Sequence, residues 1–464
     1  MSFSDKYARA FKYIMPSPFS IALVLTVLTF FISLLLTRPI ESNVFSYSLD
    51  LLDYWANGLW QDGLMVFAMQ MMLILVLGHV IALSPMVNRL INRLVSNIDN
   101  TAQAAFLVSI FTIVVALFNW GLGLIFGAIF ARKVGEHAQK QNIKINYPLV
   151  GAAGYIGLMV WHGGISGSSL TKVAEPGHLK ALMQGILSSD AIAELPEQIT
   201  FSETVFSSLN LTATALIIII LPIVFYLIGK KTKVEVPQLN FSTPPAPKPI
   251  ENLRGAARID YSKLIALSLA VVMLFWAIFT AFRQDVSAPL GFITPNYLNF
   301  LLLALGILLH GSFNNFIHAV DQAIGGAAGI LIQFPFYFGI MGMMKDSGLI
   351  TEMSNFFISI SNETTYAPFT LISAGIVNIF VPSGGGQWAV QGPIIIQSAQ
   401  ALGVDFAKSV LALAYGDQLT NMLQPFWALP LLGITGLKAK DILPYSLILM
   451  LVGSLIYLSV LLAF

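Results

Sequence analysis

The residues best suited to chemistry form a short polar run inside apolar sequence near the C-terminal end of the chain. Four of them are spaced i, i+3, i+4 and i+7, which places them on one face of a helix: Asp417, Thr420, Asn421 and Gln424. An acidic side chain in an apolar segment is itself a functional hypothesis. We predict that Asp417 carries a coupling proton or cation and that the other three complete this site. A polar seam that joins two helices is the structural alternative.

Glycine-rich segments point to a second kind of chemistry, the binding of an anion by backbone N–H groups. Glycine lets a ligand approach the chain closely, and a helix N-terminus beside such a break favours negative charge. Three segments of this kind interrupt apolar sequence, at 119–123, 162–169 and 382–387. We predict that they bind a carboxylate substrate through Asn119, Gly121, Gly123, His162, Gly163, Gly164, Ser166, Ser383, Gly384, Gly385, Gly386 and Gln387.

Residue order argues against enzyme chemistry. The run Gly164-Ile165-Ser166-Gly167-Ser168 contains the residue types of a nucleophile elbow, but that motif requires Gly-x-Ser-x-Gly on a strand-to-helix turn. The chain has no cysteine, which excludes thiol catalysis and cysteine-based metal sites. We predict no catalytic residue, no metal site, and no cofactor other than a coupling Na⁺ or H⁺.

The interrupted segments contain no arginine. A dicarboxylate or phosphate is ordinarily held by the bidentate fork of arginine, whereas amides, hydroxyls and helix dipoles can hold a small monocarboxylate. The sequence therefore favours a short monocarboxylate as the ligand.

The composition requires a lipid environment. Of 464 residues, 56% are hydrophobic and 10% are charged, and the mean hydropathy is +0.78. A soluble chain has roughly a quarter of its residues charged, so much of this surface must face lipid. The net charge of +1 gives no basic surface for nucleic acid.

Apolar segments and loop charge predict the topology. Segments that can cross roughly 30 Å of hydrocarbon lie at 17–37, 62–84, 148–165, 208–229, 262–282, 295–311, 321–344, 407–434 and 443–464. Lysine and arginine mark cytoplasmic loops. The basic segment 230–263 should therefore be cytoplasmic and the acidic segment 170–207 external. The first apolar run is too long for a signal-peptide core, so we predict a retained helix, a cytoplasmic N-terminus and an inner-membrane location.

The segment 101–131 lies between two basic loops, 85–100 and 132–146, so its two ends should lie on the same side. As one helix it would be about 46 Å long, too long for one crossing. We predict a re-entrant hairpin that enters from the cytoplasm and turns at 119–123. Two full crossings are the alternative, with limbs of about 15 residues where roughly 20 are needed.

A second hairpin, 366–400, should enter from outside. It turns at Val381-Pro382-Ser383-Gly384-Gly385-Gly386-Gln387, where proline followed by three glycines should break a helix. We expect a backbone conformation open only to glycine at Gly385.

These elements predict an all-α polytopic membrane protein with about nine transmembrane helices and two re-entrant hairpins. A proline-rich cytoplasmic linker, 230–261, divides it into an N-terminal half, 1–229, and a C-terminal half, 262–464. The halves share their element order but run in opposite directions. Such inverted repeats are typical of secondary transporters and place the site near the bilayer midplane.

Four motifs resemble the bacterial short-chain fatty acid transporter family, whose best-known members are the acetoacetate/butyrate permeases of the ion transporter superfamily. The motifs are Asn119-Trp120-Gly121-Leu122-Gly123, Trp161-His162-Gly163-Gly164, Val381-Pro382-Ser383-Gly384-Gly385-Gly386-Gln387-Trp388 and Gln424-Pro425-Phe426-Trp427. The resemblance covers essentially the whole chain. It implies uptake of acetoacetate, butyrate or similar acids by cation symport, and a homodimer. It also places binding residues at 119–123 and 383–387.

Two rival functions remain open. A carrier for a hydroxy acid or a C4-dicarboxylate would share these features. An anion channel would share the composition but would not need paired hairpins of opposite orientation.

Overall fold

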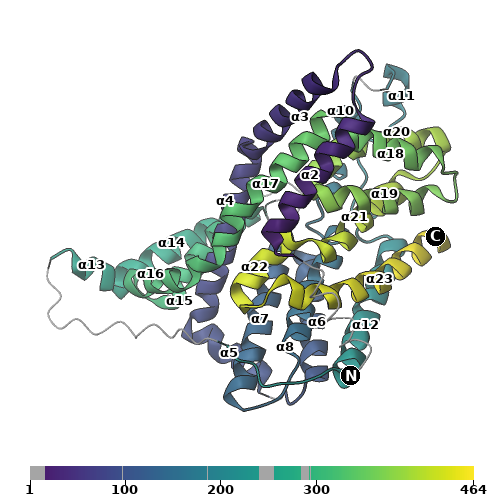
Figure 1. Ribbon diagram of the computed structural model, residues 1–464. Coiled ribbons are helices and arrows are strands. Elements are labelled where there is room, and N and C mark those ends of the chain that lie inside the picture. The colour runs from purple at the N-terminus through teal and green to yellow at the C-terminus, as the bar shows by residue number, and fades with distance from the viewer. Residues whose placement is uncertain (1–15, 97, 185–186, 240–254, 284–291, 293) are drawn as a thin grey trace.

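The computed structural model describes residues 16–464 except 97, 185–186, 240–254, 284–291 and 293 (Figure 1). The middle of the predicted linker lies outside these described residues. Within them the chain is helical and contains no β-strand, which confirms the all-α prediction. Among the described residues, eight helical segments are long and apolar enough to cross a membrane: Pro18–Leu36, Asp62–Leu83, Thr101–Phe118, Tyr147–Val173, Ser208–Lys231, Lys263–Phe282, Phe313–Asp346 and Ala439–Ala463.

The helices of the first half begin with α2 (Pro18–Leu36), α3 (Val44–Leu59), α4 (Asp62–Leu83) and α5 (Pro85–Val95). The first predicted hairpin is α6 (Thr101–Phe118) and α7 (Trp120–Lys140). An interrupted helix follows as α8 (Tyr147–Tyr155), η1 (Ile156–Met159), η2 (Trp161–Gly163) and α9 (Ser168–Val173). The short α10 (His178–Leu182) and α11 (Ser189–Ala193) then lead to α12 (Ser208–Lys231).

The second half begins with α13 (Ala257–Tyr261), α14 (Lys263–Phe282), α15 (Pro295–His310) and α16 (Phe313–Ala323). Next come η3 (Ile324–Ala327), α17 (Ala328–Asp346) and α18 (Leu349–Ser359). The second predicted hairpin is α19 (Tyr366–Phe380) and α20 (Gly384–Leu402). Another interrupted helix, α21 (Phe406–Thr420), η4 (Asn421–Leu423) and α22 (Pro425–Thr435), precedes α23 (Ala439–Ala463).

Local sequence fixes where the helices begin. Many follow a polar residue whose side chain accepts a hydrogen bond from the backbone N–H three positions later, which satisfies one of the free donors at a helix start. Asn100 does this for α6, Ser207 for α12 and Asp405 for α21.

The two halves interlock. Helix α17 packs on α2 and α3, α4 packs on α15 and α16, α7 packs on α22, and α12 packs on α23. In Figure 1, helices α14, α15 and α16 form an arm at the left, and the interrupted helices lie in the main body. The buried core therefore runs through both halves.

Glycines bring the interrupted helices close to the hairpins. A Cβ atom on Gly127 of α7 would lie 2.1 Å from the carbonyl oxygen of Gly154 in α8. A Cβ atom on Gly416 of α21 would lie 2.1 Å from the carbonyl oxygen of Leu371 in α19. Both distances are far below van der Waals contact, so a side chain at either position would push the helices apart.

Three sequence expectations need correction. The first hairpin's limbs have 18 and 21 residues, not about 15, so limb length no longer separates a re-entrant hairpin from two crossings. Helix α7 continues to Lys140, into the predicted loop 132–146. Its charged residues are accommodated there because Glu136 pairs with Arg132 at 2.9 Å and with Lys133 at 3.0 Å. The helix at 295–310 has only 16 residues, fewer than the roughly 20 that one crossing needs. The expected interruption of 407–434 is present, as the division into α21, η4 and α22.

The third correction concerns Gly385. None of the glycines 384–386 has a positive φ angle. They form the first turn of α20, and the break itself is only Val381, Pro382 and Ser383. The backbone at Gly385 is therefore helical and open to any L-residue.

Candidate functional site

The tip of the first hairpin is closed by groups of the chain itself. Asn119 separates α6 from α7, and its side chain accepts a hydrogen bond from Leu122 N at 3.0 Å. The N–H of Trp120 donates to the Ser166 hydroxyl at 3.1 Å. The first turn of α7 therefore has partners for these donors within the protein.

The tip of the second hairpin is built alike but left open. Ser383 precedes α20, and its hydroxyl accepts a hydrogen bond from Gly386 N at 3.2 Å. The N–H groups of Gly384 and Gly385 donate to no group among the described residues. Two free donors at the positive end of a 19-residue helix form a site for an anion.

A cavity of about 640 Å³ lies against this open tip. It is bounded by the tips of both hairpins, the break between η2 and α9, and the predicted external segment. Its lining is Phe67, Phe118, Trp120, Trp161, Ile165, Ser166, Ser168, Thr171, Lys172, Ala174, Glu175, Gln198, Thr200, Phe201, Ser202, Phe206, Thr294, Pro295, Ser383, Gly384, Gly385 and Trp427.

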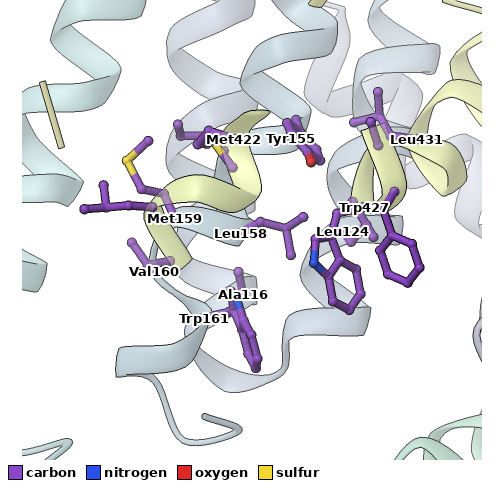
Figure 2. Close-up of a cluster of buried hydrophobic side chains, with 14 of the residues drawn as sticks. Ala116, Leu124, Tyr155, Leu158, Met159, Val160, Trp161, Met422, Trp427 and Leu431 are labelled. Atoms are coloured by element: carbon purple, nitrogen blue, oxygen red, sulfur yellow. The ribbon is translucent and has the colours of Figure 1, made fainter. Parts of the chain in front are cut away.

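Aromatic side chains from four elements form an apolar wall of this cavity. The ring centroids of Trp120 and Trp427 lie 5.2 Å apart, those of Trp120 and Trp161 5.9 Å, and those of Phe67 and Trp120 6.1 Å. Figure 2 shows Trp161 and Trp427 beside the buried side chains of the broken segments. The indole N–H of Trp161 is buried and has no hydrogen-bond partner in the described part of the chain. The cavity thus combines an apolar wall with free N–H donors, which suits a carboxylate with a short apolar tail.

A buried pair of titratable residues lies behind the second tip. The Nδ1 atom of His162 is 3.3 Å from Oδ1 of Asp417, and the two side chains are 0% and 1% exposed. This contact does not have hydrogen-bond geometry, and the second carboxylate oxygen, Oδ2, has no partner among the residues that the structure describes. The sequence did not predict that a histidine lies beside Asp417.

Ser169 fixes the tautomer of the His162 ring. Its backbone N–H lies 3.1 Å from Nε2 of the histidine, and its hydroxyl lies 3.0 Å from the same atom. A backbone N–H can only donate, so Nε2 is an acceptor and the ring proton sits on Nδ1, facing Asp417. The order Ser–His–Asp matches that of a hydrolase triad. However, Ser169 is fully buried and is not part of the cavity wall, so it cannot reach a ligand there.

The other three residues of the predicted cation face meet at Asn378 of α19. Its amide nitrogen donates to the backbone oxygen of Asp417 at 2.6 Å, to the hydroxyl of Thr420 at 2.9 Å and to Oδ1 of Asn421 at 2.8 Å. The Gln424 amide donates in turn to the carbonyl oxygen of Asn378. These contacts hold the α21–α22 break against α19 of the second hairpin. The Asp417 carboxylate is not part of them and lies against His162 instead.

The predicted substrate residues divide into two groups. Ser166, Ser383, Gly384 and Gly385 line the cavity. The others do not line it. The backbone N–H groups of His162 and Gly163 donate instead to Oε1 of Gln418, at 3.0 Å and 3.1 Å. The Gln387 amide donates to the Ala374 carbonyl at 2.9 Å. The remaining residues outside the cavity lining are Asn119, Gly121, Gly123, Gly164 and Gly386.

Sequence reasoning missed the aromatic wall, Asn378 and Ser169. The tryptophans beside three of the broken segments were a usable signal, because they recur at Trp120, Trp161 and Trp427. Asn378 and Ser169 gave none, since single polar residues in apolar helices are common.

A model of the short chain fatty acid transporter family matches residues 2–464. The chain belongs to this family. A relative from Escherichia coli (strain K12) is 36% identical over 448 residues, which are 96% of this chain and 95% of that one. A relative from Haemophilus influenzae is 36% identical over 441 residues, 94% of this chain and 93% of that one. Both are provisionally named short-chain fatty acid transporters.

Two solved transporters show a distant overall likeness. The YdaH transporter of Alcanivorax borkumensis is 14% identical with a TM-score of 0.43, covering 95% of this chain and 97% of that one. MtrF of Neisseria gonorrhoeae, from a class of antimetabolite efflux pumps, is 14% identical with a TM-score of 0.39, covering 98% and 96%. At these scores neither structure bears on the site. Membership of the short-chain fatty acid transporter family makes this chain a multi-pass membrane transporter and not an enzyme.

Proposed function

We propose that this transporter takes up short-chain monocarboxylates such as acetoacetate and butyrate by cation symport. The carboxylate binds the free N–H groups of Gly384 and Gly385, and the short tail packs on the wall that includes Trp120 and Trp427. The observation that carries this proposal is the open first turn of α20 facing a cavity with an apolar wall.

The coupling cation binds near Asp417. An ionised carboxylate that is 1% exposed is costly to bury without a compensating charge. A proton on the carboxylate would supply it. A sodium ion is the other candidate, because the side-chain oxygens of Asn378, Gln387 and Gln424 are buried acceptors without partners and hard cations prefer oxygen ligands.

A C4-dicarboxylate is the second candidate substrate. Lys172 lines the cavity and pairs with Glu175 at 2.9 Å, so a second carboxylate could replace Glu175 as its partner. The absence of arginine from the interrupted segments argues for the monocarboxylate.

We further propose the orientation and assembly that loop charge and the family resemblance support. The N-terminus is cytoplasmic, the segment 170–207 is external, the protein lies in the bacterial inner membrane, and it forms a homodimer. The two hairpins are re-entrant and belong to inverted repeats.

Counterflow in proteoliposomes tests the substrate. Vesicles loaded with unlabelled acid are diluted into a trace of the labelled acid, so that a carrier exchanges the two without any ion gradient. We expect rapid counterflow of acetoacetate and butyrate, blocked weakly or not at all by succinate. Counterflow of succinate alone would support the dicarboxylate carrier. Flux without counterflow would indicate a channel.

A further inference from the structure

The ionisable pair is separated from the cavity by a single glycine. Gly384 lines the cavity. A Cβ atom on Gly384 would lie 2.9 Å from Cε1 of His162, 3.0 Å from Cη2 of Trp161 and 3.3 Å from Oδ2 of Asp417. The unpartnered oxygen of Asp417 therefore lies directly behind the residue that offers the substrate a free N–H.

We propose that Asp417 Oδ2 is the proton-binding atom of the transporter, that His162 positions it, and that the proton arrives from the cavity past Gly384. This inference rests on the proposed uptake function and selects the proton over sodium as the coupling ion.

The orientation of His162 determines which oxygen takes the proton. Since Nε2 accepts from the Ser169 backbone, the Nδ1–H faces Oδ1. Oδ1 therefore faces an N–H at 3.3 Å, without hydrogen-bond geometry, and Oδ2 is a buried oxygen with no partner among the described residues. A proton that adds there turns the carboxylate into a neutral acid and leaves the pair uncharged in its buried position.

The surroundings of Oδ2 favour a proton over sodium. Sodium, like other hard cations, needs several oxygen ligands around it. Besides Oδ2 itself, the atoms nearest a Cβ position at Gly384 are instead two ring carbons, Cη2 of Trp161 and Cε1 of His162. On the other side of Asp417, the amide nitrogen of Asn378 donates to its backbone oxygen at 2.6 Å.

Few other ionisable groups face the pair. From α21, Asp417 is the charged residue facing His162. Tyr415 from the same helix lies beside Gly163 and donates its hydroxyl to Asn210 of α12 at 2.8 Å. The facing atoms from α9 and α20 belong to Ser169 and Gly384, which do not titrate. Asp417 and His162 are therefore the two ionisable side chains that meet at this point.

Substrate and proton would then bind on two sides of one helical turn. A carboxylate at the N–H of Gly384 places negative charge next to Oδ2, which favours protonation of Asp417. The bound proton in turn removes the repulsion between Asp417 and the substrate. Binding of each therefore strengthens binding of the other, as symport requires.

Calorimetry on the purified full-length protein in detergent measures the proton directly. Butyrate is titrated at one pH in buffers with different ionisation enthalpies, without sodium, and the buffer dependence of the heat gives the protons taken up. We expect about one proton per substrate for the parent, as electroneutral cotransport of one anion and one proton requires. We expect none for Asp417→Asn. His137→Gln, a histidine outside the site, is the matched control and should behave as the parent.

The role of His162 is tested by the pH profile of this proton uptake. His162→Asn keeps an N–H near the position of Nδ1 and should leave the profile in place. His162→Leu removes that N–H, destabilises the ionised carboxylate, and should move the profile to higher pH. A purely structural histidine would lower the thermal midpoint in both variants without moving the profile.

The outcomes separate this inference from the proposed function. Butyrate binding that releases or takes up no proton, or that requires sodium, overturns the proton site while leaving monocarboxylate transport intact. If Asp417→Asn takes up a proton as the parent does, the proton binds elsewhere. Failure of both binding and counterflow for every C2–C6 acid tested overturns the proposed function itself.

Discussion

The hydroxyl of Tyr155 lies 2.6 Å from the backbone carbonyl oxygen of Asn421 and 3.0 Å from that of Gln424. One tyrosine from the first interrupted helix thus donates to two backbone carbonyls at the break in the second. The Asn421 carbonyl also accepts from the Gln424 N–H at 3.1 Å, whereas the Gln424 carbonyl has no other donor among the described residues. Figure 2 shows Tyr155 in the buried cluster with Met422, whose neighbours it holds. The two interrupted helices therefore support each other.

Removing this hydroxyl should destabilise the core. Tyr155→Phe leaves the carbonyl of Gln424 without a donor, which costs about 1–3 kcal/mol. We expect a lower thermal midpoint for the purified protein in detergent. Tyr226→Phe, at a half-buried position of α12, is the control and should change the midpoint little. Equal midpoints for Tyr155→Phe and the parent would mean that this carbonyl has another partner.

A side chain at Gly385 should block the cavity without straining the backbone. An added Cβ there meets no atom within 4 Å, so Gly385→Val should fold and should fill space beside the free N–H groups. We expect loss of counterflow with normal membrane insertion. Gly63→Val is a matched control, because Gly63 is also the second residue of a helix and also has open space around its Cβ position. Normal counterflow in Gly385→Val would move the substrate site away from this tip.

Asn378 should matter for stability more than for ion binding. Asn378→Ala removes the donor to three oxygens at the α21–α22 break, at a cost of about 1–3 kcal/mol. We expect a lower thermal midpoint and an unchanged number of protons per substrate. A variant of normal stability that no longer requires its coupling ion would instead place Asn378 in the ion site.

The segment 170–207 is attached to the second hairpin by a contact that should depend on pH. The indole N–H of Trp388 donates to Nε2 of His178 at 3.0 Å, which requires a neutral ring nitrogen. Burial lowers the pKa of His178 from 6.5 and Lys172 lowers it further, while Glu175 opposes both. A lowered histidine pKa stabilises the folded loop above about pH 6.5, and this stabilisation is lost as the pH falls.

Limited proteolysis of the segment 170–207 can test this attachment. We expect faster cleavage as the pH is lowered from 7.5 to 5.5. His178→Gln retains an acceptor that does not titrate, so its cleavage rate should be nearly independent of pH. A parent protein whose cleavage does not depend on pH would show that the Trp388 contact survives protonation.

The topology can be tested in this cysteine-free chain. Single cysteines are introduced at Ser188 and at Ser242, the latter outside the described residues. An impermeant thiol reagent should label position 188 in whole cells and should label position 242 only after lysis. The reverse pattern would invert the proposed orientation.

Much of the architecture could be predicted from the sequence because hydropathy and helix breakers act locally. Runs of apolar residues predict the long helices. Gly and Pro residues mark the approximate positions of the four interruptions, at 119–123, 162–169, 382–387 and 417–425. The limb lengths were wrong because charged residues do not end a helix when they pair along it, as Arg132 and Glu136 do.

The site was harder to predict, because nearly every face of these helices is apolar. Which face lines the cavity depends on tertiary packing, so Gly121 and Gly385 were indistinguishable in the sequence. The pairing of His162 with Asp417 joins two segments far apart in the chain. No local pattern records such a contact.

The contrast between the two hairpin tips has a consequence for where an anion can enter. At the first tip, the Ser166 hydroxyl already accepts the N–H of Trp120. A carboxylate could reach that N–H only by displacing the serine, which is fixed in place by the chain on both sides. The N–H groups of Gly384 and Gly385 have no such competitor among the described residues, so an anion can bind at the second tip without displacing a group of the protein.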